Sequence, residues 1–303
     1  MSTIQVNRLQ VLTGHRDCVY AIQTGNNAAE VFSAGGDGMI VQWNLELPET
    51  GELIAKLPNS IYALHYMRSQ GLLIAAQNFE GIHLIDIAQR QELASLKIPG
   101  FYIFDMATHN QNVIVACGNG TVLVINSATW TVSKRLNLSQ ASARTIAICE
   151  GKGEFAVGYS DSCIRIFDLD NFSLKHEWKA HDNSVFTLKY NQDSQYLLSG
   201  SRDAKLKIWN ADGGYAKVQE IVAHMYTINH IAFSPDGKDF VTCSMDKSIK
   251  VWDSQEFKLL KVIDKARHAG HGTSVNKLAW TSFNNQLVSA SDDKTLSVWD
   301  IIF

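Results

Sequence analysis

The sequence predicts an all-β fold, a seven-bladed β-propeller of four-stranded antiparallel blades. An aromatic or apolar residue followed by Asp or Asn occurs seven times, at successive intervals of 42, 40, 42, 42, 43 and 47 residues. The seven pairs are Trp43-Asn44, Ile85-Asp86, Ile125-Asn126, Phe167-Asp168, Trp209-Asn210, Trp252-Asp253 and Trp299-Asp300. A repeat of this length that ends in Trp-Asp is typical of one propeller blade.

The fifth repeat shows most clearly how one blade is built. Residues 185–190 and 196–201 are rich in β-branched, aromatic and other apolar residues, so each is predicted to be a strand. Residues 206–209 alternate apolar and polar side chains, as a third strand does, and residues 216–222 supply a fourth. Short polar segments between these runs suit hairpin turns, so the strands are expected to be antiparallel. One such sheet cannot bury both of its faces, whereas seven stacked sheets cover one another.

The two ends of the chain are predicted to meet in the last blade. Only three residues follow Trp299-Asp300, which is too few for a fourth strand, and residues 4–12 form an additional strand-like segment before the first repeat. We therefore expect the N-terminal strand, residues 4–12, to pair as the outer strand of the last blade and to close the ring. The expectation is a single propeller domain over residues 1–303, with blades that end near residues 57, 97, 138, 179, 222, 264 and 303.

Four of the repeats share four further positions. A His precedes the first strand, a Ser or Thr lies in the second, an Asp follows it by four residues, and a Trp stands six residues after that Asp. With these motifs the chain resembles the WD-repeat (Trp-Asp repeat) β-propeller family over essentially its whole length. The matching residues are His15, Ser33, Asp37 and Trp43; His181, Ser199, Asp203 and Trp209; His224, Thr242, Asp246 and Trp252; and His271, Ser289, Asp293 and Trp299.

The resemblance implies that these residues form a structural network, which runs from the Trp N–H through hydroxyl and imidazole to carboxylate. A hydrolase triad uses the same Ser, His and Asp residue types. A catalytic site is needed only once, however, whereas this set occurs four times. A buried chain of hydrogen bonds satisfies each polar member and ties the third strand to the loop before the blade. We therefore predict no catalytic residue, and a protein that is not an enzyme.

The second, third and fourth repeats depart from the family pattern. The second carries Asn78 at the turn and has no Trp, and the third has Ile125 at the Trp position. The fourth keeps Asp161 but has Phe167 at the Trp position and no His before its first strand. We expect these three blades to be held by apolar packing alone and to open more easily than the others.

Composition favours a soluble protein of a reducing compartment. The formal net charge of −3 does not suggest a basic face for a nucleic-acid backbone, so no nucleic-acid partner is expected. The five cysteines include no Cys-x-x-Cys pair and are interpreted as small buried side chains in a reducing environment. The N-terminus is too polar for a signal peptide, and no apolar run is long enough to span a membrane. We expect an intracellular, cytoplasmic protein without a membrane association.

The last interval is the longest because of a basic insertion at residues 264–269. His268 lies in this insertion and His271 follows it, three residues later. This spacing can indicate a metal site. The family network already claims His271, and no third ligand stands nearby, so no metal and no cofactor are predicted. The insertion itself is expected to be a solvated loop.

One position near the start of each innermost strand is predicted to face a partner. In the family, partners commonly lie on the face that carries the loops before the blades, over the mouth of the central channel. Spacing gives Tyr20, Tyr62, Phe104, Arg144, Phe186, Asn229 and Asn276 at this position, with Arg202, Met245, Asp292 and Ser160 just before the turn Asp. Aromatic residues and Arg are typical of binding hot spots. Alternatively, these side chains plug the channel mouth. A one-residue slip in the alignment would reverse the direction of Arg144.

The predicted function is a non-catalytic protein–protein interaction scaffold that binds a peptide or protein on its top face around the central channel. The chain is expected to be a monomer by itself and to act within a larger complex. If Arg144 and Arg202 both reach this face, an acidic or phosphorylated peptide would suit it. Two alternatives remain open: a propeller enzyme or small-ligand binder that uses the central channel, and stacking of nucleic-acid bases on the aromatic residues. The identity of the partner cannot be read from the sequence.

Overall fold

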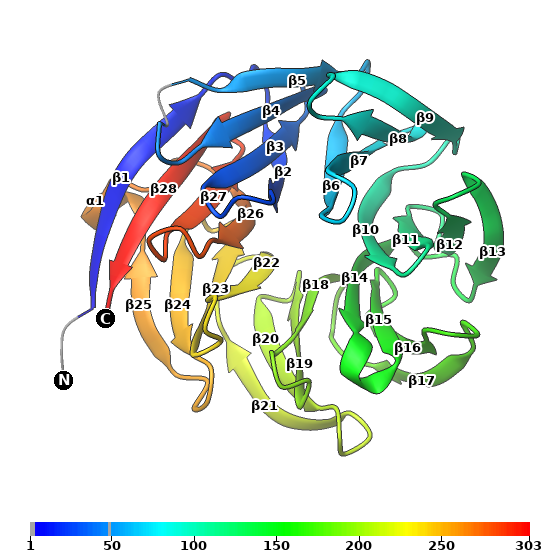
Figure 1. The fold of residues 1–303 in the computed structure, drawn as a ribbon. Helices are drawn as coiled ribbons and strands as arrows, with labels where there is room; N and C mark the ends of the chain where they lie inside the picture. Colours follow the sequence, from blue (N-terminus) through cyan, green and yellow to red (C-terminus); the bar gives the residue numbers. More distant parts are fainter. Residues whose placement is uncertain (1–3, 48–49) are drawn as a thin grey trace. The chain divides into compact units, whose positions relative to one another are not determined.

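The computed structural model describes residues 4–47 and 50–303. In this part of the chain, 28 strands form seven four-stranded antiparallel sheets (Figure 1). These sheets are the blades of a seven-bladed β-propeller, and the predicted fold class is confirmed. The strands form because short runs of β-branched and aromatic residues alternate with turn residues along the whole chain.

Each of the first six blades uses four strands that are consecutive in the sequence. The first contains β2 (Val19–Thr24), β3 (Glu30–Gly35), β4 (Met39–Asn44) and β5 (Glu52–Lys56). The second contains β6 (Ile61–Met67), β7 (Leu72–Gln77), β8 (Gly81–Asp86) and β9 (Gln91–Lys97). The third contains β10 (Ile103–His109), β11 (Asn112–Cys117), β12 (Thr121–Asn126) and β13 (Thr131–Asn137). The fourth contains β14 (Ala143–Cys149), β15 (Glu154–Tyr159), β16 (Cys163–Asp168) and β17 (Leu174–Lys179). The fifth contains β18 (Val185–Tyr190), β19 (Tyr196–Ser201), β20 (Lys205–Asn210) and β21 (Ala216–Val222). The sixth contains β22 (Ile228–Phe233), β23 (Asp239–Ser244), β24 (Ile249–Asp253) and β25 (Leu259–Ile263).

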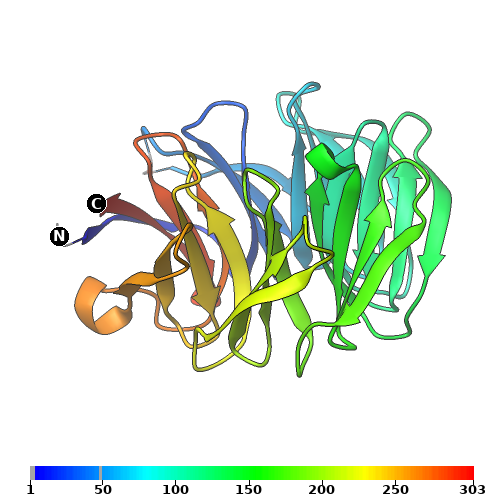
Figure 2. The same cartoon turned by 90° about the horizontal axis from the view of Figure 1, so that it is seen from below.

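The seventh blade combines strands from both ends of the sequence. Its strand order is β1 (Gln5–Thr13), β28 (Thr295–Ile302), β27 (Leu287–Ser291) and β26 (Val275–Trp280). β1 runs antiparallel to β28, with Gln5 opposite Ile302 and Thr13 opposite Thr295. The beginning of β1 lies beside the end of β28 in both views (Figures 1 and 2). The predicted pairing of the N-terminal strand into the last blade is therefore confirmed.

The described residues form two compact units. The first comprises the described residues up to Ala75, residues 84–93 and residues 229–303, and the second comprises residues 76–83 and 94–228. The first and seventh blades and nearly all of the sixth belong to the first unit, and the third, fourth and fifth belong to the second. The second blade contributes to both units. The expectation of a single domain over the whole chain stays a prediction.

Within each unit, neighbouring blades bury one another's apolar faces. In the first unit, Leu12 and Val298 of the seventh blade share a buried cluster with Trp43 of the first. In the second unit, Ile166 of the fourth blade shares a cluster with Trp209 of the fifth. Full burial of one such side chain contributes roughly 1.5–3 kcal/mol, so the packing between blades holds each unit together.

The predicted basic loop contains one helical turn, α1 (Lys265–His268), where a solvated loop was expected. Asp264 caps it because its carboxylate accepts a hydrogen bond from the Arg267 N–H (2.8 Å). Arg8 of β1 donates to the carbonyl of Ala269 (2.5 Å), which ties this turn to the seventh blade. A 3₁₀ turn, η1 (Glu150–Lys152), lies in the fourth blade. Neither turn, nor any other helix of the described residues, is long and apolar enough to cross a membrane.

Candidate partner-binding site

The predicted partner-binding residues lie at one end of each sheet. We call the segment before the first strand of a blade its lead-in loop. Since neighbouring strands are antiparallel, this loop lies at the same end of the sheet as the turn between the second and third strands. We call this end the lead-in end of the blade.

A β-bulge positions five of these residues. Where the first two strands of a blade pair, the register shifts by one residue near the lead-in end in the first, third, fourth, fifth and seventh blades. The additional residues are Tyr20, Phe104, Arg144, Phe186 and Asn276. A bulge leaves one residue unpaired in the ladder and re-aims its side chain. Arg144 therefore occupies the same place in its strand as Phe186.

In the second unit, Arg144 lies between two aromatic rings. The carbon of its guanidinium is 4.3 Å from the centre of the Phe104 ring and 4.6 Å from that of Phe186. Its Nε donates a hydrogen bond to Ser160 Oγ (3.0 Å). Each cation–π contact contributes about 0.5–2 kcal/mol. These residues come from three consecutive blades, so packing between blades assembles the group.

Two exposed aromatic residues extend this group. The Tyr102 ring stacks on Phe104 with 5.6 Å between centroids, and Phe79 contacts Tyr102 at 4.6 Å. Phe79 is 42% exposed and Tyr102 43%. Neither residue was predicted from the sequence, although an aromatic residue in a short turn, where Gly, Asn, Asp and Ser dominate, was an available signal. We name Phe79, Tyr102, Phe104, Arg144 and Phe186 the aromatic–arginine cluster.

Backbone hydrogen bonds join the two loops that carry the exposed rings. The Phe79 N–H donates to the Phe101 carbonyl (2.8 Å), and the Gly100 N–H donates to the Phe79 carbonyl (3.2 Å). The buried Asn78 side chain accepts from the Ile103 N–H (2.9 Å). Phe79 itself adopts a left-handed backbone conformation, with φ of 67°. The second blade's turn, which departs from the family motif, therefore presents the exposed Phe79 ring on a backbone that hydrogen bonds hold in place.

In the first unit, most of the predicted residues contact one another. Tyr20 and Tyr62 meet edge to face with 4.6 Å between ring centroids. Burial raises the pKa of Tyr20, with a smaller contribution from its neighbour Cys18. Asn276 donates to Asp292 Oδ1 (2.8 Å) and to a backbone carbonyl of the first blade. These contacts match what the plug alternative expects of this group.

The remaining predicted residues show three different environments. Asn229 donates to Ser274 Oγ (3.0 Å) and to the Val275 carbonyl (2.8 Å) in the first unit. Met245 is 57% exposed in the same unit. Arg202 is exposed in the second unit, and its side chain forms no hydrogen bond or ion pair with the described residues. No described contact therefore brings Arg144 and Arg202 together, and the pair of guanidinium groups considered for an acidic or phosphorylated peptide stays a prediction.

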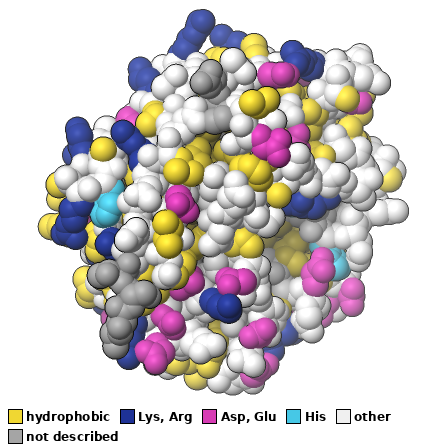
Figure 3. All heavy atoms as spheres, turned by 60° about the vertical axis from the view of Figure 1, so that its left-hand side comes forward, with side chains coloured by type: hydrophobic (Ala, Val, Ile, Leu, Met, Phe, Trp, Pro, Cys, Tyr) yellow, Lys and Arg dark blue, Asp and Glu magenta, His cyan; other side chains and the backbone are white. Residues whose placement is uncertain are grey.

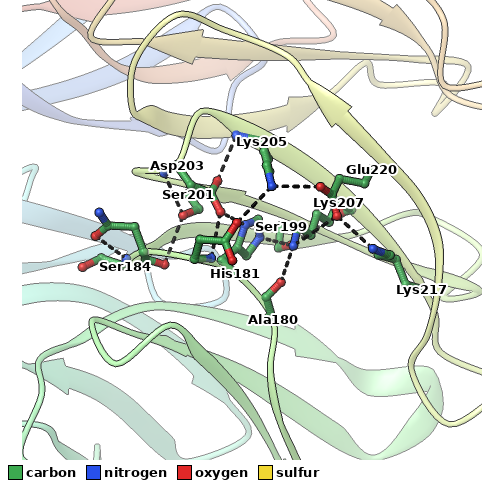
Figure 4. Close-up of polar contacts among 12 residues, drawn as sticks. Ala180, His181, Ser184, Ser199, Ser201, Asp203, Lys205, Lys207, Lys217 and Glu220 are labelled. Carbon is green, nitrogen blue, oxygen red and sulfur yellow. Dashed lines mark hydrogen bonds and ion pairs between the residues drawn. The ribbon is translucent and has the colours of Figure 1, made fainter.

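The His, Ser, Asp and Trp residues form one chain of hydrogen bonds in the first, fifth and seventh blades. In the fifth blade, Trp209 Nε1 donates to Ser199 Oγ (2.8 Å), and His181 Nε2 lies 2.8 Å from the same oxygen. His181 Nδ1 lies 2.9 Å from Asp203 Oδ2 (Figure 4). The geometry ties the third strand to the lead-in loop. In the sixth blade, the corresponding Trp252 donates to the hydroxyl of its own second strand (2.9 Å).

This geometry suits a structural role better than catalysis. Ser33, Ser199 and Ser289 are 0% exposed, and each hydroxyl contacts both a Trp N–H and a His nitrogen. A nucleophile must reach its substrate, and these oxygens face the protein interior. Over the described residues there is also no group of three or more His, Cys, Asp or Glu side chains placed to hold a metal ion.

Burial sets the protonation states of these networks. It lowers the pKa of His15 and His181 below the ordinary value, although the paired carboxylates act in the opposite direction. Burial alone would raise the pKa of Asp203, but the hydrogen bond and charge of His181 outweigh it and hold that pKa low. In the same way the pKa of Asp293 falls to about 2 beside His271. At neutral pH these directions favour neutral imidazoles at His15 and His181 and ionised carboxylates at Asp203 and Asp293.

The fourth blade contains a polar network of different composition, so the expectation of apolar packing alone is wrong for this blade. Asp161 accepts hydrogen bonds from Ser139 Oγ (2.7 Å) and Arg165 Nη1 (2.9 Å). Arg165 also donates to Glu177 Oε1 (2.6 Å). Ser139 precedes Asp161 by 22 residues, the interval between His and Asp in the other networks. This arrangement was not predicted from the sequence, because Ser139 stands where the motif has His.

Comparison with known proteins matches these repeats to one family. The family described as WD domain, G-beta repeat (WD40) matches residues 6–44, 172–210, 216–253 and 262–300. The four segments together cover slightly more than half of the 303 residues. They contain the four repeats that carry the full motif.

Curated relatives are longer than this chain. It is 28% identical to "Polyadenylation factor subunit 2" of Candida albicans over 129 residues, which are 43% of this chain and 20% of that protein. It is 27% identical to "Intraflagellar transport protein 80 homolog" of Mus musculus over 229 residues, 72% of this chain and 29% of the relative. It is 22% identical to "66 kDa stress protein" of Physarum polycephalum over 271 residues, 86% of this chain and 43% of the relative. The chain therefore spans less than half of the length of these relatives.

A solved structure shares the fold. The crystal structure of the WD40 β-propeller domain of Doa1 aligns with a TM-score of 0.86 over 97% of each chain, at 18% sequence identity. At this identity the likeness shows the fold alone. Because the family matches more than half of the chain and the blades carry its hydrogen-bonded motif, the protein belongs to the WD40 repeat family.

Proposed function

We propose that this protein is a non-catalytic protein–protein interaction scaffold that binds a protein or peptide partner at the lead-in ends of its blades. The observation that carries the proposal is the aromatic–arginine cluster of the second unit. Its two outer rings, Phe79 and Tyr102, are more than 40% exposed although each is held in place by neighbouring contacts. Rigid aromatic residues next to Arg are the residues that dominate binding energy at protein interfaces.

The cluster is suited to a partner because it is already ordered. Arg144 is held by two rings and by Ser160, so binding need not restrict a mobile guanidinium. Truncation of a hot-spot residue costs about 2 kcal/mol or more of binding free energy, equal to a loss of roughly 30-fold in affinity. We therefore assign the main binding surface to the aromatic–arginine cluster of the second unit. The remaining candidates, Tyr20, Tyr62, Asn229, Asn276 and Asp292, would then be secondary contacts.

Charge favours a protein partner over a nucleic acid. The formal net charge is −3, and the face in Figure 3 shows Lys and Arg interspersed with Asp and Glu. This face therefore lacks the continuous positive charge that a phosphate backbone requires. The five cysteines form no disulfide in the structure, which supports a reducing compartment, and we propose the cytoplasm. There the chain would be a monomer by itself and join a larger complex through its partner.

Affinity capture from native extract with quantitative mass spectrometry tests the proposal. The variant Phe79→Ala/Tyr102→Ala should lose a defined set of proteins that wild type retains. A matched control is Val218→Ala/Val222→Ala, which removes two exposed side chains (50% and 75%) from the outer strand of the fifth blade. This control should retain the same proteins as wild type. Identical sets for wild type and the cluster variant, with both folded, would reject the proposed surface.

A further inference from the structure

A second site lies in the first unit, in a pocket between the first and second blades. The pocket has a volume of about 420 Å³. It is lined by Glu30, Gln42, Glu52, Tyr66, Gly71, Ile87, Ala88 and Arg90. These residues lie at or near the hairpin turns at the opposite end of the sheets from the lead-in loops. The pocket shares no residue with the aromatic–arginine cluster, and its volume suits a small ligand or one inserted side chain.

Tyr66 presents an unused hydroxyl to this pocket. The residue is only 8% exposed, and its ring stacks on Phe32 with 5.7 Å between centroids. The hydroxyl forms no hydrogen bond with any residue that the structure describes, although it lines the pocket. Burial, followed by the charge of Glu30, raises the pKa of Tyr66, so the hydroxyl stays neutral. The ring is buried, whereas the hydroxyl oxygen is open to the pocket, so a ligand there can form a hydrogen bond with it.

Glu30 contributes a carboxylate to the lining of the same pocket. Its oxygens accept hydrogen bonds from Gln42 Nε2 (2.5 Å) and from the Asn26 N–H (3.0 Å). A carboxylate has about four acceptor positions, so these two bonds leave capacity for a ligand. The bonds also hold the carboxylate in one orientation.

At the mouth, Glu52 forms an ion pair with Arg90 (2.5 Å), and the two side chains are 61% and 53% exposed. An ion pair this exposed contributes little to stability and can open at low cost. The nearby Arg68 is occupied by Gly25 and Thr24, to which it donates at 2.7 and 3.1 Å. The lining therefore contains two carboxylates and one guanidinium, and its side chains offer mainly hydrogen-bond acceptors.

We propose that this pocket binds a guanidinium group, supplied either by an arginine side chain of a partner or by a free guanidine compound. A guanidinium carries five N–H donors, a fixed positive charge and no acceptor, which complements two carboxylates and a neutral hydroxyl. Glu30 and Tyr66 receive it inside the pocket. Arg90 swings away from Glu52, which then pairs with the ligand. The internal pair of Glu52 and Arg90 shows that the mouth already accommodates a guanidinium.

Nuclear magnetic resonance titration with Nα-acetyl-arginine amide tests this site on the full chain. Tyr66→Phe should weaken binding about 5-fold, because one hydrogen bond is lost. Glu30→Gln should weaken it at least about 10-fold, because a charge-assisted bond is lost. Arg90→Met should strengthen it, because the internal competitor for Glu52 is removed. The control Glu46→Gln, an exposed carboxylate of the first blade outside the pocket, should leave the affinity unchanged.

Further ligands test the chemistry and its source. The uncharged isostere Nα-acetyl-citrulline amide should bind at least about 10-fold more weakly than the arginine compound. Tighter binding of acetyl-Gly-Arg-Gly amide than of agmatine would indicate a partner's arginine, and the reverse order would indicate a free guanidine. Equal binding of the citrulline compound would overturn the proposal. So would equal affinities of wild type, Tyr66→Phe and Glu30→Gln, since Tyr66→Phe preserves the packing of the ring.

Discussion

At the scale of the residue, the same side-chain types serve different roles because their burial differs. Asp203 is almost completely buried and binds His181, whereas Asp212 is largely exposed and pairs with Lys152. Arg144 is ordered by aromatic rings, whereas Arg202 has no such neighbours among the described residues. Burial and local partners, more than residue type, therefore separate structural from candidate binding residues.

Asp203→Ala should destabilise the protein. The carboxylate accepts hydrogen bonds from two backbone N–H groups and lies against the buried His181, so its removal leaves three groups without this partner. We expect a loss of about 1–3 kcal/mol in the free energy of unfolding, measured by urea denaturation. Asp193→Ala, which removes an exposed carboxylate of the same blade, is the control and should have little effect. Equal midpoints for the two variants would contradict the structural role.

Stability should fall as the pH decreases below about 6.5. Because burial lowers the pKa of His15 and His181, the folded protein binds fewer protons there than the unfolded chain, whose His pKa is near 6.5. The stability that these groups contribute is complete above that pH and is lost below it. Asp203 and Asp293, whose pKa values are lowered, add to the loss below about pH 4. Urea midpoints from pH 7.5 to 5 measure the effect, and His181→Asn should reduce the slope.

At the scale of the element, one blade can replace the family network with another. The fourth blade has Ser139 and Arg165 around its turn Asp, and Glu177 extends the network from the neighbouring strand. Arg165 and Glu177 are directly opposite in the pairing of β16 with β17, so the antiparallel register brings them together. A blade without the motif His and the motif Trp is therefore still held by polar contacts between its strands and its lead-in loop.

Arg165→Met should destabilise the fourth blade. The Arg165 side chain is 6% exposed and bonds to two carboxylates, which would lose their partner. Breaking a fully buried pair costs about 3–5 kcal/mol, and we expect about 2 kcal/mol here because Glu177 is 42% exposed. Hydrogen exchange of β16 and β17 measures the change locally. Arg135→Met, at an exposed arginine of the third blade, should not change the exchange of these strands.

At the scale of the whole molecule, the predicted single domain requires the two compact units to unfold together. The second blade contributes residues to both units. If one unit can unfold while the other stays folded, two unfolding transitions are expected. A single domain would unfold in one step. The sequence predicts the single domain.

Calorimetry should therefore show one unfolding transition, with equal calorimetric and van't Hoff enthalpies. Destabilising either unit should lower the same transition, so His15→Ala in the first unit and Arg165→Met in the second should each shift the whole peak. Two separated peaks, each moved by only one of these variants, would instead assign the units to separate domains.

The repeat by itself determined the strands, their antiparallel order and the seven blades. Hairpins are local, so turn residues and periodic β-formers specify them within about 40 residues of sequence, as the fifth repeat illustrates. Spacing also identified the position of Tyr20, Phe104, Arg144, Phe186 and Asn276, because every blade places this position at the same end. The motif residues around Ser33 and Ser199 were found for the same reason.

Only the tertiary structure decided which of these side chains meet. Phe79 stands six residues before Ile85, at the position of the motif Asp, but it joins the cluster only through a left-handed turn and through Tyr102, which lies in a different loop. Arg165 finds Glu177 through strand register, and Tyr66 lines the same pocket as Glu30 because the first and second blades pack side by side. Such contacts depend on the packing of segments far apart in the sequence, where a shift of one residue changes the partner. The candidate sites are therefore products of packing between blades, whereas the blades are products of local sequence.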